Sequence, residues 1–319
     1  MAIVVAAWFI AFVSTPVSPP STPFKFSIKS GSSLKSVARQ INTSGLPITP
    51  WQFELMARLF DKGRDLKAGN YQLDASISPL DLLEKLRRGD TLQNEITFIE
   101  GQTFVQMRKI LAGNAGLKPD SALLSELAVM QLIGATETRA EGFFFPDTYG
   151  FTDGMSDTAI LKRAYQTMQA NLAKAWEKRP PGLPYESPYQ ALIMASIIEK
   201  ETGKAEERPR IAAVFVNRLK SGMKLQTDPT IIYSMGARFD GNIRKRDLLA
   251  DTPYNTYVRS GLPPTPIAMP GLASIEAALN PASTAELYFV AKGDGSHQFS
   301  HSLQEHNSAV AKYQKLGVH

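Results

Sequence analysis

The feature that most constrains this chain is an apolar run that ends in charged residues. Seven of the eight residues from Ala191 to Ile198 are apolar. Ser187 can cap a helix and Pro188 fits the first helical position. A helix that is apolar on every side is buried inside a protein. We therefore expect a buried helix whose last turn carries Glu199.

Glu199 is the candidate acid of this helix. Partial desolvation and the negative end of the helix dipole both favour the neutral carboxyl there. A carboxyl that keeps its proton near neutral pH suits a general acid. The alternative is that Glu199 and Glu201 only mark where the helix reaches solvent, and spacing alone favours this alternative.

Composition excludes several classes of protein. The 319 residues carry a net charge of +5, 20% charged and 43% hydrophobic residues, as an ordinary globular chain of two or three domains does. The basic residues are scattered, so we expect no nucleic-acid partner. Cysteine is absent, and His297, His301 and His306 lack the spacing of a zinc protease. Because phosphate-loop and dinucleotide motifs are also missing, we expect neither a metal nor another cofactor.

Residues 1–13 are uncharged, and residues 14–23 have the composition of a linker. Thirteen residues are too few to span a bilayer, and a signal peptide would carry a basic flank. By itself the segment is compatible with the core of a signal peptide or with a buried strand.

A strand–glycine–helix pattern occurs twice. Shifted by seventy positions, Gly31, Ser33 and Ile41 fall on Gly101, Thr103 and Leu111. The pattern predicts two related α/β units, at 24–90 and 94–175. The proline-rich stretch at 175–188 then marks a boundary. The predicted fold class is α+β.

The C-terminal part combines an irregular segment with a hairpin. Residues 237–270 contain several prolines and few apolar runs, and long irregular segments are often functional. Tyr254, Asn255 and Tyr257 are candidates there for exposed sugar contacts. Thr227–Pro229 has the form of a capped helix start, which favours Asp228 as a cap over Asp228 as a catalyst. Strands at 287–291 and 298–300 should form a hairpin, and Ser302 with Glu305 fits a capping box.

Four long motifs resemble the YceG-like family, the endolytic murein transglycosylases called MltG. They are IIEKETGKAEERPRIAAVFVNRLKSGMKLQTDPTIIY, EGFFFPDTYGF (141–151), DTPYNTYVRSGLPPTPIAMPG (251–271) and LYFVAKGDGSHQFSHSLQEHN (287–307). The motifs occur in the family's order, and the resemblance covers most of the chain from about Phe24. It implies a LysM-like, glycan-binding β-α-α-β subdomain at 24–90 and a catalytic domain at 91–319, of which 187–319 is the catalytic core.

The resemblance also implies a mechanism. The first Glu of the E-K-E-T run is the family's catalytic residue, which maps onto Glu199. One carboxyl protonates the glycosidic oxygen of a MurNAc–GlcNAc bond in a nascent strand. It then takes the proton of the C6 hydroxyl, which leaves a 1,6-anhydroMurNAc end. The candidate substrate contacts are Gln226, Thr227, Asp228, Tyr254, Asn255, Tyr257, His301 and Glu141.

Two other functions remain open from the sequence. A muramidase that hydrolyses would need Glu141 or Glu201 as a second carboxylate. A non-catalytic peptidoglycan-binding scaffold would need neither residue. In all three cases the expected partner is a peptidoglycan glycan strand, with the cell-wall synthesis machinery as a further candidate. The resemblance implies that residues 1–13 are a shortened single-pass anchor in the bacterial inner membrane, with the catalytic domain in the periplasm.

Overall fold

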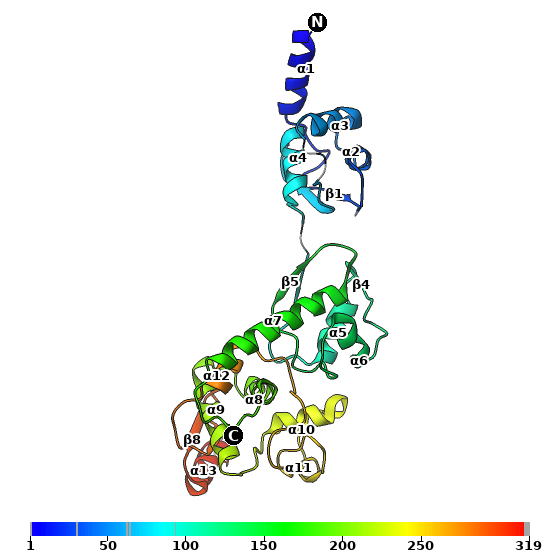
Figure 1. The fold of residues 1–319 in the computed structure, drawn as a ribbon. Coiled ribbons are helices and arrows are strands. Elements are labelled where there is room, and N and C mark those ends of the chain that lie inside the picture. The colour runs from blue at the N-terminus through cyan, green and yellow to red at the C-terminus, as the bar shows by residue number, and fades with distance from the viewer. Residues whose placement is uncertain (1, 30, 62, 64, 93, 316–319) are drawn as a thin grey trace. The chain divides into compact units, whose positions relative to one another are not determined.

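A computed structural model describes residues 2–29, 31–61, 63, 65–92 and 94–315. The chain forms two compact units, and Figure 1 labels most of their helices and several of their strands. Unit 1 comprises Met1–Glu95, Ala115–Lys118 and Gly150–Met155. Unit 2 comprises Ile96–Asn114, Pro119–Tyr149 and Ser156–His319.

The secondary structure is mixed, with more helix than strand, in agreement with the predicted α+β class. The α-helices are α1 (Ala2–Ser14), α2 (Leu34–Thr43), α3 (Pro50–Leu59), α4 (Pro79–Arg88), α5 (Phe104–Ala112), α6 (Glu126–Ile133), α7 (Asp157–Glu177), α8 (Pro188–Glu201), α9 (Arg208–Lys220), α10 (Asp228–Met235), α11 (Lys245–Leu249), α12 (Leu272–Leu279) and α13 (Leu303–Val310). Shorter helical turns are η1 (Ala205–Glu207), η2 (Gly236–Arg238) and η3 (Ala311–Lys315). The strands are β1 (Phe24–Ile28), β2 (Gly69–Leu73), β3 (Asn94–Thr97), β4 (Leu117–Lys118), β5 (Thr148–Phe151), β6 (Met155–Ser156), β7 (Tyr288–Ala291) and β8 (His297–Ser300).

Unit 1 is built on the antiparallel pair β1–β2, in which Phe24 lies opposite Leu73 and Ile28 opposite Gly69. Side chains of β1 alternate between buried and exposed, as a strand with one covered face requires. Helices α2, α3 and α4 contribute most of the rest of one apolar core, which also contains Tyr71 of β2 and Val13 of α1. The order of these elements is strand, two helices, strand, as the sequence pattern predicts.

The repeat predicted at a shift of seventy residues is present in the backbone. Gly31 and Gly101 both adopt left-handed conformations, with φ of 74° and 78°, which favour glycine. Ser33 caps α2, and Thr103 caps α5 through a full capping box with Gln106. The same local chemistry therefore starts a helix at the same place in each half.

Helix α1 carries the uncharged N-terminal segment. Its Trp8 ring stacks on Trp51 of α3, with ring centroids 5.8 Å apart. Among the residues that the structure describes, no helix is both long enough and apolar enough to span a bilayer. The assignment of residues 1–13 to a membrane anchor stays a prediction.

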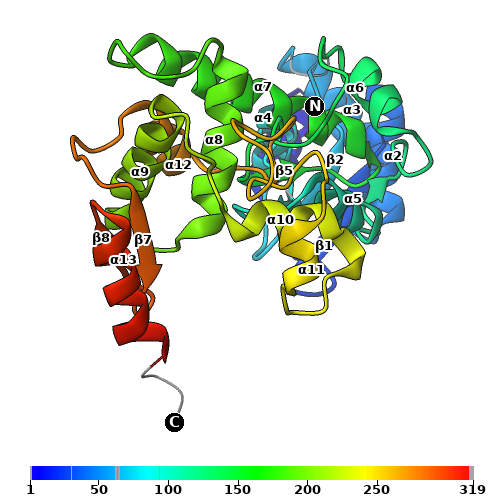
Figure 2. The same ribbon diagram turned by 90° about the horizontal axis from the view of Figure 1, so that it is seen from below.

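Unit 2 is organised around α8, as the sequence predicts. Every residue from Ala191 to Ile198 is buried, and the Ser187 side chain caps the helix by accepting from the Gln190 N–H. Helix α8 packs against α12, α9, α7 and α10, and these elements surround it in Figure 2. Because neighbours cover it on all sides, the helix can be apolar all round.

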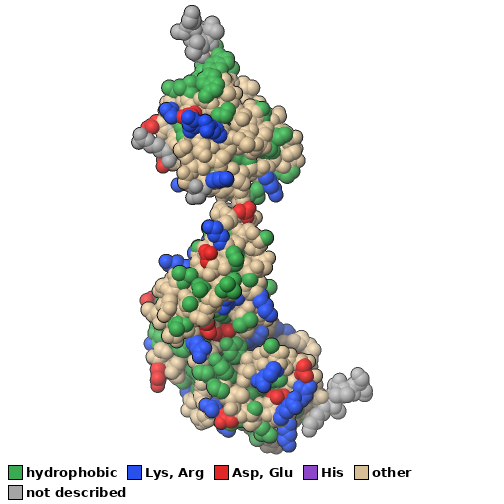
Figure 3. Space-filling view, turned by 90° about the vertical axis from the view of Figure 1, so that its right-hand side faces the viewer, with side chains coloured by type: hydrophobic (Ala, Val, Ile, Leu, Met, Phe, Trp, Pro, Cys, Tyr) green, Lys and Arg blue, Asp and Glu red, His purple; other side chains and the backbone are tan. Residues whose placement is uncertain are grey.

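Strands β7 and β8 form the predicted hairpin, in which Tyr288 lies opposite Ser300 and α13 packs against both strands. The expected capping box at α13 is not closed. Ser302 does accept from the Glu305 N–H, but the Glu305 carboxylate accepts from His301 N–H, one residue before the cap. On the face shown in Figure 3, basic and acidic side chains are interspersed.

Candidate active site

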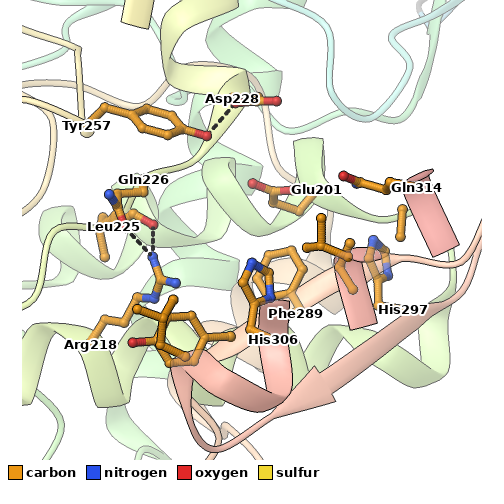
Figure 4. Close-up of a pocket in the computed structure, with 15 residues that line it drawn as sticks. Glu201, Arg218, Leu225, Gln226, Asp228, Tyr257, Phe289, His297, His306 and Gln314 are labelled. Carbon is orange, nitrogen blue, oxygen red and sulfur yellow. Dashed lines mark hydrogen bonds between the residues drawn. The ribbon is translucent and has the colours of Figure 1, made fainter. Parts of the chain in front are cut away.

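A pocket of about 470 Å³ opens in unit 2 between the C-terminal end of α8, the start of α10, the β7–β8 hairpin and α13 (Figure 4). Its volume is in the range of small-molecule and sugar sites. The polar and aromatic residues that line it are Glu201, Arg218, Gln226, Asp228, Tyr257, Tyr288, Phe289, His297, His306 and Gln314.

Glu201 is the last residue of α8 and faces this pocket. Glu201 is partly exposed, on the pocket side, and many protein atoms lie around its carboxyl. This burial raises the pKa of Glu201 to about 7, opposed by a hydrogen bond from the Thr227 hydroxyl and assisted by the charge of Asp228. A carboxyl with this pKa still holds its proton in part of the molecules near neutral pH. That property suits a general acid.

Arg218 supplies the positive charge of the pocket. Its Nε donates to the Leu287 carbonyl at 2.7 Å and its Nη1 to the Leu225 carbonyl at 2.8 Å. The guanidinium lies over the Tyr288 ring, 5.1 Å from the centroid. Burial lowers the pKa of Arg218, which nevertheless stays protonated because its ordinary value is so high. The pocket therefore has one cation fixed by backbone carbonyls.

The segment that enters α10 is fastened to the loop around residue 256. Gln226 has a φ of 52°, which is uncommon for a residue other than glycine. Its N–H donates to the Thr256 carbonyl at 3.1 Å. Tyr257 donates its hydroxyl hydrogen to Asp228 Oδ1 at 2.6 Å. These contacts bring Gln226, Thr227, Asp228 and Tyr257, all predicted from sequence as substrate contacts, together around the Glu201 carboxyl.

Two expectations about this region are wrong. Asp228, the residue expected to cap α10, instead accepts from the Tyr257 hydroxyl, and Thr227 at the N-cap position donates its hydroxyl to Glu201. Asn255 is not exposed. Only 1% of its surface is accessible, and its amide donates to the carbonyls of Asp247, Leu248 and Ala250. Its role in the loop is to hold backbone carbonyls that would otherwise be unpaired.

The other three predicted contacts lie outside the pocket. Tyr254 packs its ring on Tyr233, with centroids 4.9 Å apart. The Glu141 carboxylate accepts from the Phe104 N–H at 3.1 Å and from the Tyr233 hydroxyl at 3.1 Å, and burial raises its pKa to about 7. His301 is exposed at the end of the hairpin. Glu141 therefore holds the start of α5 to α10.

Glu199 lies on another face of α8, because residues two apart on a helix point about 200° apart. Its Oε2 accepts from the Gly271 N–H at 2.9 Å, and its Oε1 lies 3.8 Å from Arg208 Nη2. Only 6% of the side chain is exposed. Burial and the charge of Glu199 raise the pKa of the nearby Glu100 carboxyl. The structure therefore places Glu199 in a charged cluster that does not line the pocket.

Arg218 and His297 are among the pocket residues that the sequence did not single out as substrate contacts. Arg218 lies on the apolar face of α9 that Ile211, Val214 and Phe215 define. A charged residue on an apolar helix face is unusual, and this pattern could have identified Arg218 as a functional candidate from the sequence. His297 is held by Glu207, ninety residues away in sequence, with Nδ1 2.7 Å from the Glu207 Oε2. No local pattern predicts that pair.

Known proteins resemble the chain over nearly its full length. A sequence model of the YceG-like family matches residues 26–312. An endolytic murein transglycosylase of Bacillus subtilis is 33% identical over 316 residues, which covers 93% of this chain and 87% of the relative. An endolytic murein transglycosylase of Streptococcus pneumoniae is 29% identical, and the match covers 90% of this chain and 57% of the relative.

A solved structure of a YceG-like protein also matches the chain. The crystal structure of a YceG-like protein from Listeria monocytogenes superposes with a TM-score of 0.59 at 30% sequence identity. The match covers 89% of this chain and 97% of that one. The family match, the relatives and the shared fold agree, and the chain belongs to the YceG-like family.

Proposed function

We propose that the chain cleaves murein glycan strands at internal bonds, as an endolytic lytic transglycosylase, and that Glu201 is its acid–base residue. The activity follows from membership of a family whose relatives are named endolytic murein transglycosylases. One observation carries the choice of residue. The Glu201 carboxyl lines the 470 Å³ pocket, and burial raises its pKa to about 7.

The reaction needs one carboxyl used twice. Neutral Glu201 donates its proton to the glycosidic oxygen as the bond from that oxygen to C1 of MurNAc breaks. The C6 oxygen of the same sugar then forms a bond to C1, and its proton passes to the Glu201 carboxylate. The residue ends protonated, no water is consumed and the product carries a 1,6-anhydro end. Tyr257 offers an aromatic face, and Arg218 and Gln226 offer hydrogen-bond donors, to the bound sugars.

Glu199, to which the family resemblance assigned the acid, remains the alternative acid. Its oxygens are engaged by the Gly271 N–H and lie beside Arg208, and it does not line the pocket. We assign it instead to holding the C-terminal turn of α8 against the backbone at Gly271. The two glutamates can be separated by single substitutions, because each keeps its own set of contacts.

Hydrolysis is the rival chemistry, and it needs a second carboxylate. Within the described part of the pocket lining, Asp228 is the other acidic side chain. The test is mass analysis of the muropeptides released from purified sacculi by the wild type and by Asp228→Asn. We expect 1,6-anhydro ends from both proteins. Wild-type products with reducing ends, each one water heavier than the 1,6-anhydro product, would support a muramidase if Asp228→Asn no longer released them. Sacculi that stay uncleaved would support a binding scaffold.

Unit 1 supports a second part of the proposal. Its strand–helix–helix–strand order matches that of LysM-like modules, and we assign it to binding glycan strands. Trp8 is 44% exposed and Trp51 is 56% exposed. Such paired indole rings suit the interfacial region of a bilayer. We infer that α1 and this ring pair hold the protein at the inner membrane, with the pocket in the periplasm near the cell-wall synthesis machinery.

The unit 1 assignments can be tested with the full chain. Trp51→Ser should lower sedimentation with vesicles of phosphatidylethanolamine and phosphatidylglycerol, without changing turnover on soluble glycan strands. Unchanged sedimentation would remove the ring pair from the proposal.

A further inference from the structure

A second polar pair lies in the wall of the pocket that Glu201 faces. His297 is the first residue of β8 and Glu207 is the last residue of η1. Glu207 Oε1 accepts from the His297 backbone N–H at 3.0 Å, and its Oε2 lies 2.7 Å from the His297 Nδ1. Both side chains are largely buried, with 11% and 15% exposed. The pair therefore joins the segment after α8 to the hairpin.

The pair determines which ring nitrogen of His297 is free. Burial alone would raise the pKa of Glu207, but the two hydrogen bonds from His297 outweigh it and hold this pKa below its usual range. The Glu207 carboxylate can then only accept, so Nδ1 carries the proton. In neutral imidazole the other nitrogen, Nε2, has a free lone pair. Among the residues that the structure describes, no hydrogen bond to Nε2 is present.

The ring is fixed as well as oriented. The Phe289 ring meets His297 edge-on, with centroids 5.4 Å apart and an interplanar angle of 87°. His297 and Phe289 line the same pocket as Glu201, as Figure 4 shows. His306, on the same wall, stacks on Tyr288, and burial lowers its pKa. The hairpin and α13 thus present ordered rings to the pocket, which suits contact with a sugar.

We propose that His297 positions the substrate: its Nε2 accepts a hydrogen bond from the C6 hydroxyl of the sugar bound beside Glu201, and Glu207 holds the ring for that contact. The proposal rests on the proposed transglycosylase function. An intramolecular attack requires the hydroxyl to point at C1, and a fixed acceptor reduces the orientations that it can adopt. The C6 hydroxyl donates to Nε2 while Glu201 is protonated. Once Glu201 has given its proton to the glycosidic oxygen, the hydroxyl hydrogen turns to the Glu201 carboxylate, which takes it as the bond from the C6 oxygen to C1 forms.

The experiment compares His297→Ala, His297→Gln and Glu207→Gln with the wild type on soluble, uncrosslinked glycan strands. Gln298→Ala is the matched control, because its side chain leaves the opposite face of the same strand. The kcat of His297→Ala should fall about 10- to 100-fold, the range expected when a reacting group is misplaced. Its KM should change less than about threefold, and added imidazole should restore part of the turnover.

Glu207→Gln should lower kcat about 3- to 10-fold. The Gln amide can donate an N–H to His297 Nδ1 as well as accept from it, so it no longer fixes the His297 tautomer in which Nε2 is the acceptor. His297→Gln should fall between His297→Ala and the wild type, because its amide oxygen can reach roughly where Nε2 lies. Gln298→Ala should behave as the wild type. Thermal unfolding of each variant shows whether the fold is kept.

Three results would overturn the proposal. An unchanged kcat in both His297→Ala and Glu207→Gln would remove the contact. A rise in KM alone would make His297 a binding residue with no part in orientation. Loss of turnover that follows loss of thermal stability and that imidazole does not restore would make the pair structural. Failure of the proposed function is seen separately, as wild-type products without 1,6-anhydro ends or as an active Glu201→Gln enzyme.

Discussion

Replacing Glu201 by Gln isolates the acid, because the amide keeps the shape of the side chain. Its oxygen can still accept the hydrogen bond from Thr227, which the structure gives to Glu201 Oε1. An amide cannot donate a proton to the glycosidic oxygen. General acid–base catalysis contributes roughly 10²- to 10⁴-fold, and here one residue serves both transfers. We therefore expect turnover to fall about 10⁴-fold, with the fold and strand binding retained.

The same substitution should change stability in a pH-dependent way. The pKa of Glu201 rises from 4.5 to about 7 on folding. The folded state then binds the proton more tightly, so this contribution to stability is present below pH 4.5 and is lost as pH rises through about 7. At about 1.4 kcal/mol per pKa unit, the difference is about 3 kcal/mol. At pH 8 Glu201→Gln should therefore unfold several degrees higher than the wild type, and near pH 4 the two should agree.

The assay measures release of 1,6-anhydro products between pH 5 and pH 9, alongside thermal unfolding at both ends of that range. Wild-type turnover should fall above about pH 7 as Glu201 loses its proton. Glu199→Gln is the matched control and should keep most of its turnover, because Glu199 does not line the pocket. A Glu201→Gln enzyme with near wild-type turnover, beside an inactive Glu199→Gln enzyme, would refute the assignment and favour Glu199.

Asn255→Ala should lower the free energy of unfolding by roughly 2–4 kcal/mol in urea titration, since three backbone carbonyls lose a buried donor; lost turnover at unchanged stability would instead favour a sugar contact. Glu141→Gln should keep 1,6-anhydro production, since Glu141 lies outside the pocket lining, and an inactive, folded variant would contradict this. Gly142→Ala should destabilise by more than about 2 kcal/mol, because φ is 85° and the new Cβ would lie 2.4 Å from Pro266 Cγ. Gly261 has a similar φ of 83°, but a Cβ added there would meet no atom within 4 Å, so Gly261→Ala should lower the free energy of unfolding less than Gly142→Ala. Equal losses of stability in urea titration would show that backbone strain, and not the contact with Pro266, causes the loss.

Local chemistry was sufficient for the elements that position the site. The apolar run before Glu199, with Ser187 and Pro188 at its start, predicted a buried helix, and α8 is buried over that run. The Gly31 and Gly101 repeat needed only a left-handed glycine followed by a capping side chain. The hairpin at β7–β8 followed from two short strand-like runs on either side of the glycine-rich turn at 293–295. Such signals act between residues close in sequence, so they can be read before the tertiary structure is known.

Tertiary packing decided which side chains share the pocket. Glu199 and Glu201 differ by two positions on one helix, and only the neighbours of α8 determine which of them faces Tyr257 and Arg218. Asn255 looked exposed because its loop is irregular, yet the loop closes around its amide. The orientation of a helix and the closure of a loop depend on contacts between segments tens of residues apart. A single sequence carries no local record of those contacts, so the pocket that leads us to propose Glu201 in place of Glu199 is seen only in the fold.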